Sequence, residues 1–222
     1  FYKIRIEDKP YIRFPELQSD DLLMFGSYYA IKPEIRSMVS EFINNCKNSG
    51  AIVVYDPNFR LAHLKMLDQL KPFIEENIAV ADIAKGSDED FKNIFHTEDA
   101  EKTFSVLHHL GCQSMIYTRN RYGVDLHTTD YQHHYDAIGV KPVSTVGAGD
   151  TFTAGMAYWL FKNNISKNKL QHLSPDEYEQ MINTAIRFAT NVCKSYDNYI
   201  SFDFINELNE SFIDQPENKK EI

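Results

Sequence analysis

Cysteine is scarce in this chain of 222 residues, and the three that occur are Cys46, Cys112 and Cys193. Their number is odd, their spacing is wide and no Cys-x-x-Cys pair is present, so we expect reduced thiols of a cytoplasmic protein rather than a disulfide framework. Long apolar runs are also missing, because none approaches the ~20 residues that span a bilayer. The sequence therefore predicts no membrane segment.

Clusters of basic residues are absent as well. The chain has 23 Lys and Arg against 32 Asp and Glu, which gives a formal net charge of −9. An acidic chain without a Lys/Arg-rich run is a poor partner for nucleic acid, so we expect no nucleic-acid binding. Small anions are still candidate ligands, because a helix N-terminus binds them through backbone N–H groups.

Two common nucleotide-binding motifs are missing too. The sequence contains no G-x-x-x-x-G-K-[ST], which excludes a P-loop. Gly147 and Gly149 have the first spacing of a dinucleotide fingerprint, but Phe152 stands where that fingerprint needs its third glycine. A nucleotide site in this chain must therefore be of another kind.

Strand and helix patterns alternate along the chain. Apolar runs typical of buried parallel strands occupy residues 21–27, 51–56 and 114–118, with a shorter candidate at 77–84. Helical patterns occupy residues 32–50, 87–95, 97–111, 147–163 and 174–196, and a hairpin or meander is expected from about 123 to 143. This alternation predicts an α/β fold, a three-layer αβα sandwich with a mostly parallel central sheet. We expect one domain over residues 1–222, with 214–222 as a frayed tail.

Two of these helices carry a start signal. Ser87 is followed three residues later by Asp90, and Ser174 is followed by Glu177 at the same spacing. A serine and an acid three residues apart form a capping box, in which each side chain bonds the backbone N–H of the other. Both serines are therefore predicted N-caps.

The stretch VSTVGAGDTFTAG (143–155) combines a bare backbone with a charge. Gly147, Ala148 and Gly149 come directly before Asp150 and a helical run. Small residues at a helix N-terminus let an anion approach the free N–H groups closely. The alternative is a tight turn that needs glycine only for a positive φ.

Asp150 favours the first interpretation. A carboxylate beside an anion cradle repels the anion, so it needs another task. It can accept the proton of a hydroxyl that attacks a phosphoryl group, while the N–H groups stabilise the charge that builds up. The alternative is an acid that complements the helix dipole, worth about 0.3–1 kcal/mol. Together the turn and the acid predict a phosphotransferase site.

This stretch resembles the C-terminal signature of the ribokinase-like (PfkB) carbohydrate kinases, in which Gly-Ala-Gly-Asp precedes an aromatic residue and a helix of small residues. Three more segments resemble that family in order and spacing: YDPNFR (55–60), ADIAKGSDEDF (81–91) and YTRNRYG (117–123). The similarity covers nearly the whole chain and is strongest to fructokinase-type members. It implies an ATP-dependent kinase that phosphorylates a sugar hydroxyl, with fructose favoured as the substrate.

The resemblance also implies roles for individual residues. Asp150 would be the catalytic base, with Gly147, Ala148 and Gly149 as the anion hole for the phosphates of ATP. Other contacts carry over by position: Thr118 and Gly123 along the triphosphate, Asn58 and Arg60 toward the phosphates or the sugar, and Asn191 and Lys194 beside adenine. Mg²⁺ would bridge the phosphates, mostly through water.

Three departures from the family pattern bear on these roles. Ser87-x-x-Asp90 replaces Asn-x-x-Glu, and the capping box explains that pair equally well, although Asp90 could still hold Mg²⁺-bound water. Asn120 stands where glycine is usual, which matters if this position has a positive φ, and Asn tolerates that better than most residues. The family's N-terminal sugar-binding part and β-lid have no counterpart here, so we expect an N-terminally truncated form.

Two other functions stay open from the sequence. One is a kinase of the same fold with another acceptor, such as a nucleoside, a keto-deoxy sugar acid or a phosphosugar. The other is a non-catalytic nucleotide-binding module or pseudokinase. A homodimer is an arrangement that the resemblance allows, because family members often dimerise through the lid.

Overall fold

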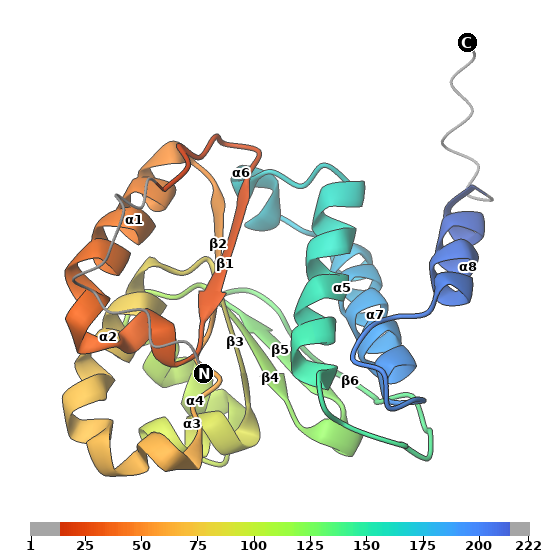
Figure 1. The fold of residues 1–222 in the computed structure, drawn as a ribbon. Helices are drawn as coiled ribbons and strands as arrows, with labels where there is room; N and C mark the ends of the chain where they lie inside the picture. The colour runs from red at the N-terminus through yellow and green to blue at the C-terminus, as the bar shows by residue number, and fades with distance from the viewer. Residues whose placement is uncertain (1–13, 214–222) are drawn as a thin grey trace.

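The computed structural model of the chain describes residues 14–213, so the expected tail at 214–222 and the segment 1–13 lie outside it. A six-stranded sheet forms the centre of the described part, with its strands in chain order (Figure 1). The strands are β1 (Leu22–Gly26), β2 (Ile52–Asp56), β3 (Ile83–Ser87), β4 (Ser114–Thr118), β5 (Val124–Thr128) and β6 (Gln132–Tyr135). Strands β1 to β4 pair parallel, and β5 and β6 add antiparallel. The predicted mostly parallel sheet is confirmed.

Helices cover both faces of this sheet, as the sequence predicts (Figure 1). On one face lie α1 (Arg36–Ser49), α2 (Leu67–Val80), α3 (Asp88–Phe95) and α4 (Ala100–His109). On the other lie α5 (Ala148–Lys162), α6 (Lys167–Leu170) and α7 (Pro175–Val192), with α8 (Phe202–Ile213) against α7. Successive side chains of a strand point to opposite faces. Accordingly, Val54 of β2 packs in the cluster under α5 and α7, whereas Tyr55 packs in the cluster under α2 and α3.

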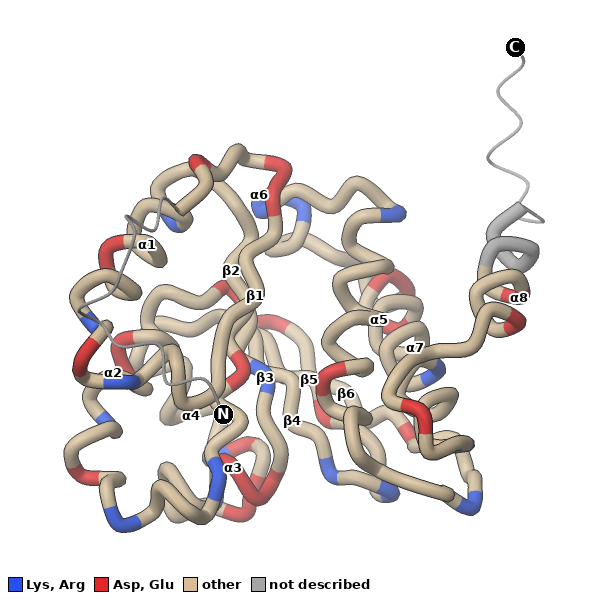
Figure 2. Tube along the Cα trace, in the orientation of Figure 1, with Lys and Arg blue, Asp and Glu red and all other residues tan. Residues whose placement is uncertain are grey.

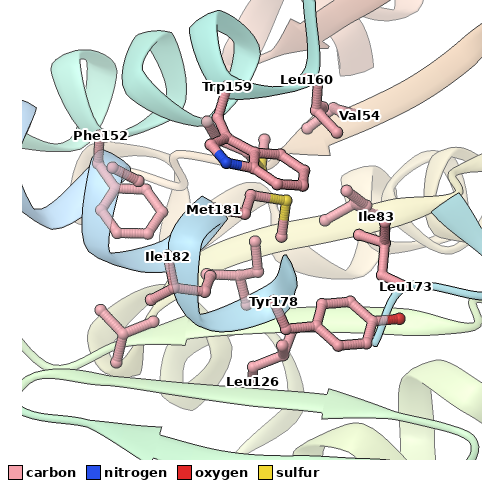
Figure 3. Close-up of a cluster of buried hydrophobic side chains, with 14 of the residues drawn as sticks. Val54, Ile83, Leu126, Phe152, Trp159, Leu160, Leu173, Tyr178, Met181 and Ile182 are labelled. Carbon is pink, nitrogen blue, oxygen red and sulfur yellow. The ribbon is translucent and has the colours of Figure 1, made fainter. Parts of the chain in front are cut away.

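The layer of α5 and α7 is anchored by Trp159, the single tryptophan of the chain (Figure 3). Its side chain is buried beside Met181 of α7 and above Ile83 of the sheet. Gly155, one turn earlier on α5, lets α7 approach closely, because a Cβ there would lie 2.7 Å from Cγ of Phe188. This packing fixes where the first turn of α5 lies relative to the sheet.

The predicted helix ends are largely confirmed. Ser87 and Ser174 both form capping boxes, with Asp90 and Glu177 as their partners. Gly50 ends α1 in the left-handed conformation, with φ +84°, as a glycine after a helix commonly does. Cys46 and Cys112 are buried, Cys193 is partly buried, and all three are free thiols.

Two expected elements are wrong in extent. The strand candidate 77–84 is split between the end of α2 at Val80 and the start of β3 at Ile83, because the buried face of α2 and the strand are adjacent apolar runs. The hairpin expected to reach Val143 ends at Tyr135, and residues 136–147 belong to no helix or strand.

Among residues 14–213, no helix is long and apolar enough to cross a bilayer. Acidic and basic residues are both distributed over the described trace (Figure 2).

Candidate functional site

The carboxyl ends of four parallel strands meet at one edge of the sheet. Gly26 of β1 pairs with Asp56 of β2, and Ser87 of β3 pairs with Thr118 of β4. In open α/β sheets, ligands bind outside the carboxyl ends of the strands. The predicted site residues of β2 and β4 and their loops therefore lie at the edge where this fold binds ligands.

The first turn of α5 has the form of an anion cradle. Gly147 is the N-cap, and its φ of +82° lies in the left-handed region that favours glycine. The N–H of Thr151 donates to the carbonyl of Gly147 at 2.8 Å, and the N–H of Ala148 donates to Thr145. The N–H groups of Gly149 and Asp150 have no hydrogen-bond partner within the part of the chain that the structure describes. The positive φ of this turn thus explains why residue 147 is a glycine. The N–H groups of Gly149 and Asp150 remain available to an anion.

Asp150 faces a cleft that it shares with the end of the sheet. The cleft has a volume of about 230 Å³, and its wall includes Asp150, Asp56, Asn58, Gly26 at the end of β1 and the following Ser27. The structure therefore brings the predicted base together with Asn58, one of the predicted contacts. Asp150 itself is exposed, so a bound hydroxyl can reach it.

A larger cavity of about 430 Å³ lies elsewhere, between residues 14–17 and α1. None of its lining residues is a predicted site residue, and none lines the cleft at Asp150. We therefore place the candidate site at the smaller cleft, where the predicted chemistry is.

Asp56 begins the segment that resembles D-x-N-x-R. Its Oδ1 accepts the N–H of Asn58 at 3.2 Å, and Asn58 has a φ of +39°. Burial raises the pKa of Asp56 above its usual value, although the nearby Lys85 acts in the opposite direction. Arg60 is exposed, and among residues 14–213 its side chain has no ion pair or hydrogen bond.

Lys85 is a site residue that the sequence analysis missed. It lies on β3 with a side chain that is 6% exposed, and its Nζ donates to Oδ2 of Asp56 at 2.6 Å. The signal was present in the segment 81–91, where a lysine interrupts an apolar strand. A lysine is almost never buried without a partner, so its place in that strand indicated a charge pair.

The carboxylate of Asp90 accepts hydrogen bonds from two neighbouring segments. Its Oδ2 accepts the N–H and the hydroxyl of Ser87 at 2.9 and 2.6 Å, and its Oδ1 accepts the N–H of Phe59 at 2.6 Å. The carboxylate thus ties the loop after β2 to the start of α3. The described residues contain no group of three His, Cys, Asp or Glu placed to hold a metal ion. Contact of Asp90 with Mg²⁺-bound water stays a prediction.

The segment 117–123 forms a compact loop after β4. Asn120 has a φ of +51°, which confirms that this position takes the conformation for which glycine is usual. Gly123 has a φ of +90°, and a Cβ there would lie 2.1 Å from the carbonyl oxygen of Tyr135. Thr118 donates its hydroxyl to the carbonyl of Gly86 at 3.3 Å. A side chain at position 123 would therefore collide with β6, which explains the glycine. Contact of Gly123 with a nucleotide stays a prediction.

The segment that contains Asn191 and Lys194 lies beside the turn of α5. The N–H of Val143 donates to the carbonyl of Cys193 at 2.8 Å, and Asn198 lies against the open side of Gly147. Oδ1 of Asn191 accepts the N–H of Ser201, whereas Lys194 is exposed. The structure thus brings this segment to the turn, and the role of both residues toward adenine stays a prediction.

A known protein family matches most of the chain. Residues 7–196 match the pfkB family carbohydrate kinase description. The chain belongs to the PfkB family of carbohydrate kinases. The matched range includes every predicted site residue, from Asn58 to Lys194.

Curated relatives in this family are similar over part of their length. An ATP-dependent 6-phosphofructokinase of Thermoanaerobacterium thermosaccharolyticum is 26% identical over 155 residues, which are 70% of this chain and 48% of the relative. A fructokinase of Klebsiella pneumoniae is 29% identical over 142 residues, which are 64% of this chain and 46% of the relative. The PfkB chain therefore spans about half the length of the relatives that it matches.

Solved structures of PfkB-type kinases share the fold. Aminoimidazole riboside kinase from Salmonella enterica, complexed with aminoimidazole riboside and an ATP analog, superposes with a TM-score of 0.74 at 23% identity, over 88% of this chain and 64% of that one. A fructokinase double mutant from Vibrio cholerae in a fructose-, ADP- and potassium-bound form gives 0.70 at 20% identity, over 83% and 57%. The ribokinase-like three-layer fold is therefore confirmed.

Proposed function

We propose that this chain is the nucleotide-binding and catalytic part of an ATP-dependent sugar kinase, with fructose as the favoured acceptor. One observation carries the proposal. The exposed Asp150 lies on the first turn of α5, beside the free N–H groups of that turn, and faces a cleft that it shares with Asp56 and Asn58. An acid and an anion cradle thus lie within one turn of helix, and the acid faces the cleft at the end of β1 and β2.

In this proposal Asp150 acts as the base. Its carboxylate takes the proton of the acceptor hydroxyl as the acceptor oxygen bonds to the γ-phosphorus of ATP. The bond from that phosphorus to the β,γ-bridging oxygen breaks, and ADP leaves with the electron pair. The free N–H groups of Gly149 and Asp150 stabilise charge on the transferring group, which is where most catalysis of phosphoryl transfer arises. The predicted anion hole of Gly147, Ala148 and Gly149 is thus shifted along the turn, because the N–H of Ala148 donates to the carbonyl of Thr145.

ATP and Mg²⁺ fit the residues that are present. The two free N–H groups at the turn suit phosphate oxygens, and the helix dipole favours their charge. A carboxylate has about four lone-pair sites, so Asp90 retains acceptor capacity beyond its three hydrogen bonds. When bound, Mg²⁺ would neutralise charge on the phosphates. Thr118, Gly123, Asn191 and Lys194 are proposed ATP contacts, and Arg60 a phosphate or sugar contact.

A nucleoside is the second candidate acceptor. A relative named aminoimidazole riboside kinase, from Salmonella typhimurium, is 25% identical over 150 residues of this chain. Fructose is favoured because several relatives are named fructokinases, at 24% to 29% identity. A single domain, a homodimer and a cytoplasmic location are further predictions of this account.

The proposal is tested by offering the full-length form Mg-ATP and a panel of acceptors: fructose, fructose 6-phosphate, ribonucleosides and a keto-deoxy sugar acid. We expect fructose phosphate to be the main product, because several of the relatives are named fructokinases. Products are identified by mass spectrometry, with ADP release as the rate. A nucleoside phosphate as the sole product would transfer the proposal to the second acceptor. Tight ATP binding without any product in the full-length form would favour a non-catalytic module.

A further inference from the structure

Lys85 places a buried positive charge between Asp56, which lines the cleft, and the first turn of α5. It lies on β3, its Nζ donates to Oδ2 of Asp56 on β2 at 2.6 Å, and the same atom lies 3.5 Å from the carbonyl oxygen of Gly149 on α5. The side chains of Lys85 and Asp56 are 6% and 18% exposed. One ammonium group on β3 therefore contacts both Asp56 of β2 and the first turn of α5.

Stability alone is a weak explanation for this pair. Taking two charges out of water costs several kcal/mol per ion, and apolar replacements of a buried ion pair are often neutral or stabilising. The pair is also at the carboxyl edge of the sheet, where Asp56 lines the cleft of Asp150. Its position thus agrees better with a task at the site.

Gly149 shows how closely the ammonium approaches the anion cradle. A Cβ added to Gly149 would have Nζ of Lys85 as its one close neighbour, at 3.3 Å. The missing side chain of Gly149 therefore leaves room for Lys85 as well as for an anion. The cation lies directly against the residue whose free N–H is part of the proposed anion hole.

We propose that Lys85 is a positioning residue of the transfer site, which holds the first turn of α5 and Asp56 in one arrangement and adds positive charge beneath the anion hole. This inference rests on the proposed function. Lys85 attracts a phosphate at the turn, whereas Asp56 cancels part of that attraction. The two members of the pair thus act on ATP with opposite signs.

Opposite signs give a test that separates charge from packing. Lys85→Met keeps the length of the side chain and removes its charge, so we expect Mg-ATP to bind about tenfold more weakly. Asp56→Asn keeps the shape and removes the cancelling charge, so we expect Mg-ATP to bind more tightly than to the unchanged chain. Dissociation constants are measured by calorimetry without acceptor. Equal weakening in both variants would show that the pair serves packing, and unchanged affinity in Lys85→Met would overturn the proposal.

Lys167 offers a matched control. Its Nζ pairs with Oδ2 of Asp82 at 2.9 Å, its side chain is 22% exposed, and it also contacts the carbonyl of Ala51, so it lies at the opposite, amino-terminal edge of the sheet. Lys167→Met removes a comparable Lys–Asp pair away from the turn. We expect it to leave the affinity for Mg-ATP unchanged.

Amide hydrogen exchange tests the positioning role without a ligand. The N–H of Thr151 closes the first turn of α5 by donating to Gly147. We expect it to exchange faster in Lys85→Met than in the unchanged chain or in Lys167→Met. Equal exchange rates of this N–H in all three chains would overturn the positioning role. This test needs no ATP, so its outcome is independent of whether the chain binds ATP as the proposed function requires. If Lys85→Met does not fold, the double variant with Asp56→Asn removes both charges and is measured in the same two ways.

Discussion

Replacing Asp150 by Asn should lower phosphoryl transfer by about 100- to 10,000-fold, the range that a general base contributes. The amide keeps the size of the carboxylate but does not take up the proton of the acceptor hydroxyl. Mg-ATP should bind no more weakly than to the unchanged chain, because the N–H groups of Gly149 and Asp150 come from the backbone and a charge that repels the phosphates is removed. Initial rates and calorimetric dissociation constants, measured on the same preparation, separate the two effects.

Asp176 provides the control for this variant. It is an exposed acid in the first turn of α7, so Asp176→Asn loses the same interaction with a helix dipole away from the cleft. We expect Asp176→Asn to keep the full transfer rate. Transfer by Asp150→Asn at the rate of the unchanged chain would show that Asp150 only complements the dipole of α5.

Replacing Gly155 by Val should lower the free energy of unfolding by at least about 1–3 kcal/mol, the usual cost of overpacking a core. The new Cβ would lie 2.7 Å from Cγ of Phe188 and 2.9 Å from Cα of Ala185, so α5 and α7 must separate. In a helix without this contact, a glycine replacement is neutral or stabilising. The sign of the change therefore reports the close packing of the two helices. Urea unfolding followed by circular dichroism measures it.

Gly139→Val is the matched comparison, because a Cβ at Gly139 has no neighbour within 4 Å. It should leave the unfolding free energy nearly unchanged. Since α5 carries Asp150, Gly155→Val should also weaken Mg-ATP binding. Equal stability of the two valine variants would mean that α5 does not pack on α7 as the structure shows.

The turn at α5 was predictable because its chemistry is local. Gly147, Gly149 and Asp150 lie within four residues of one another in the sequence. A loop of small residues before a helix, followed by an acid, is compatible with few functions. The parallel sheet was predictable for a similar reason, because runs such as 51–55 are apolar at every position. Helix α2 was missed, because its apolar residues merge with those of β3 into one run near 77–84.

Contacts between distant segments could not be predicted from the sequence. Lys85 and Gly149 are 64 residues apart, and only the crossing of α5 over the end of β3 brings them together. Likewise, the sequence predicts Asp90 only as part of a helix cap. Its hydrogen bond from the N–H of Phe59 could not be predicted, because it depends on how the loop after β2 folds. Local patterns thus predicted the anion cradle and the base, while the charge beneath them required the structure.

The most direct test of the account is a calorimetric titration of Mg-ATP into this chain, with cooperative unfolding as proof that it is folded. We predict saturable binding at one site, weakened in Gly149→Val, whose side chain would meet the ammonium of Lys85. Absence of binding by a folded chain, or binding that Gly149→Val leaves unchanged, would contradict the claim that the first turn of α5 binds the phosphates of ATP.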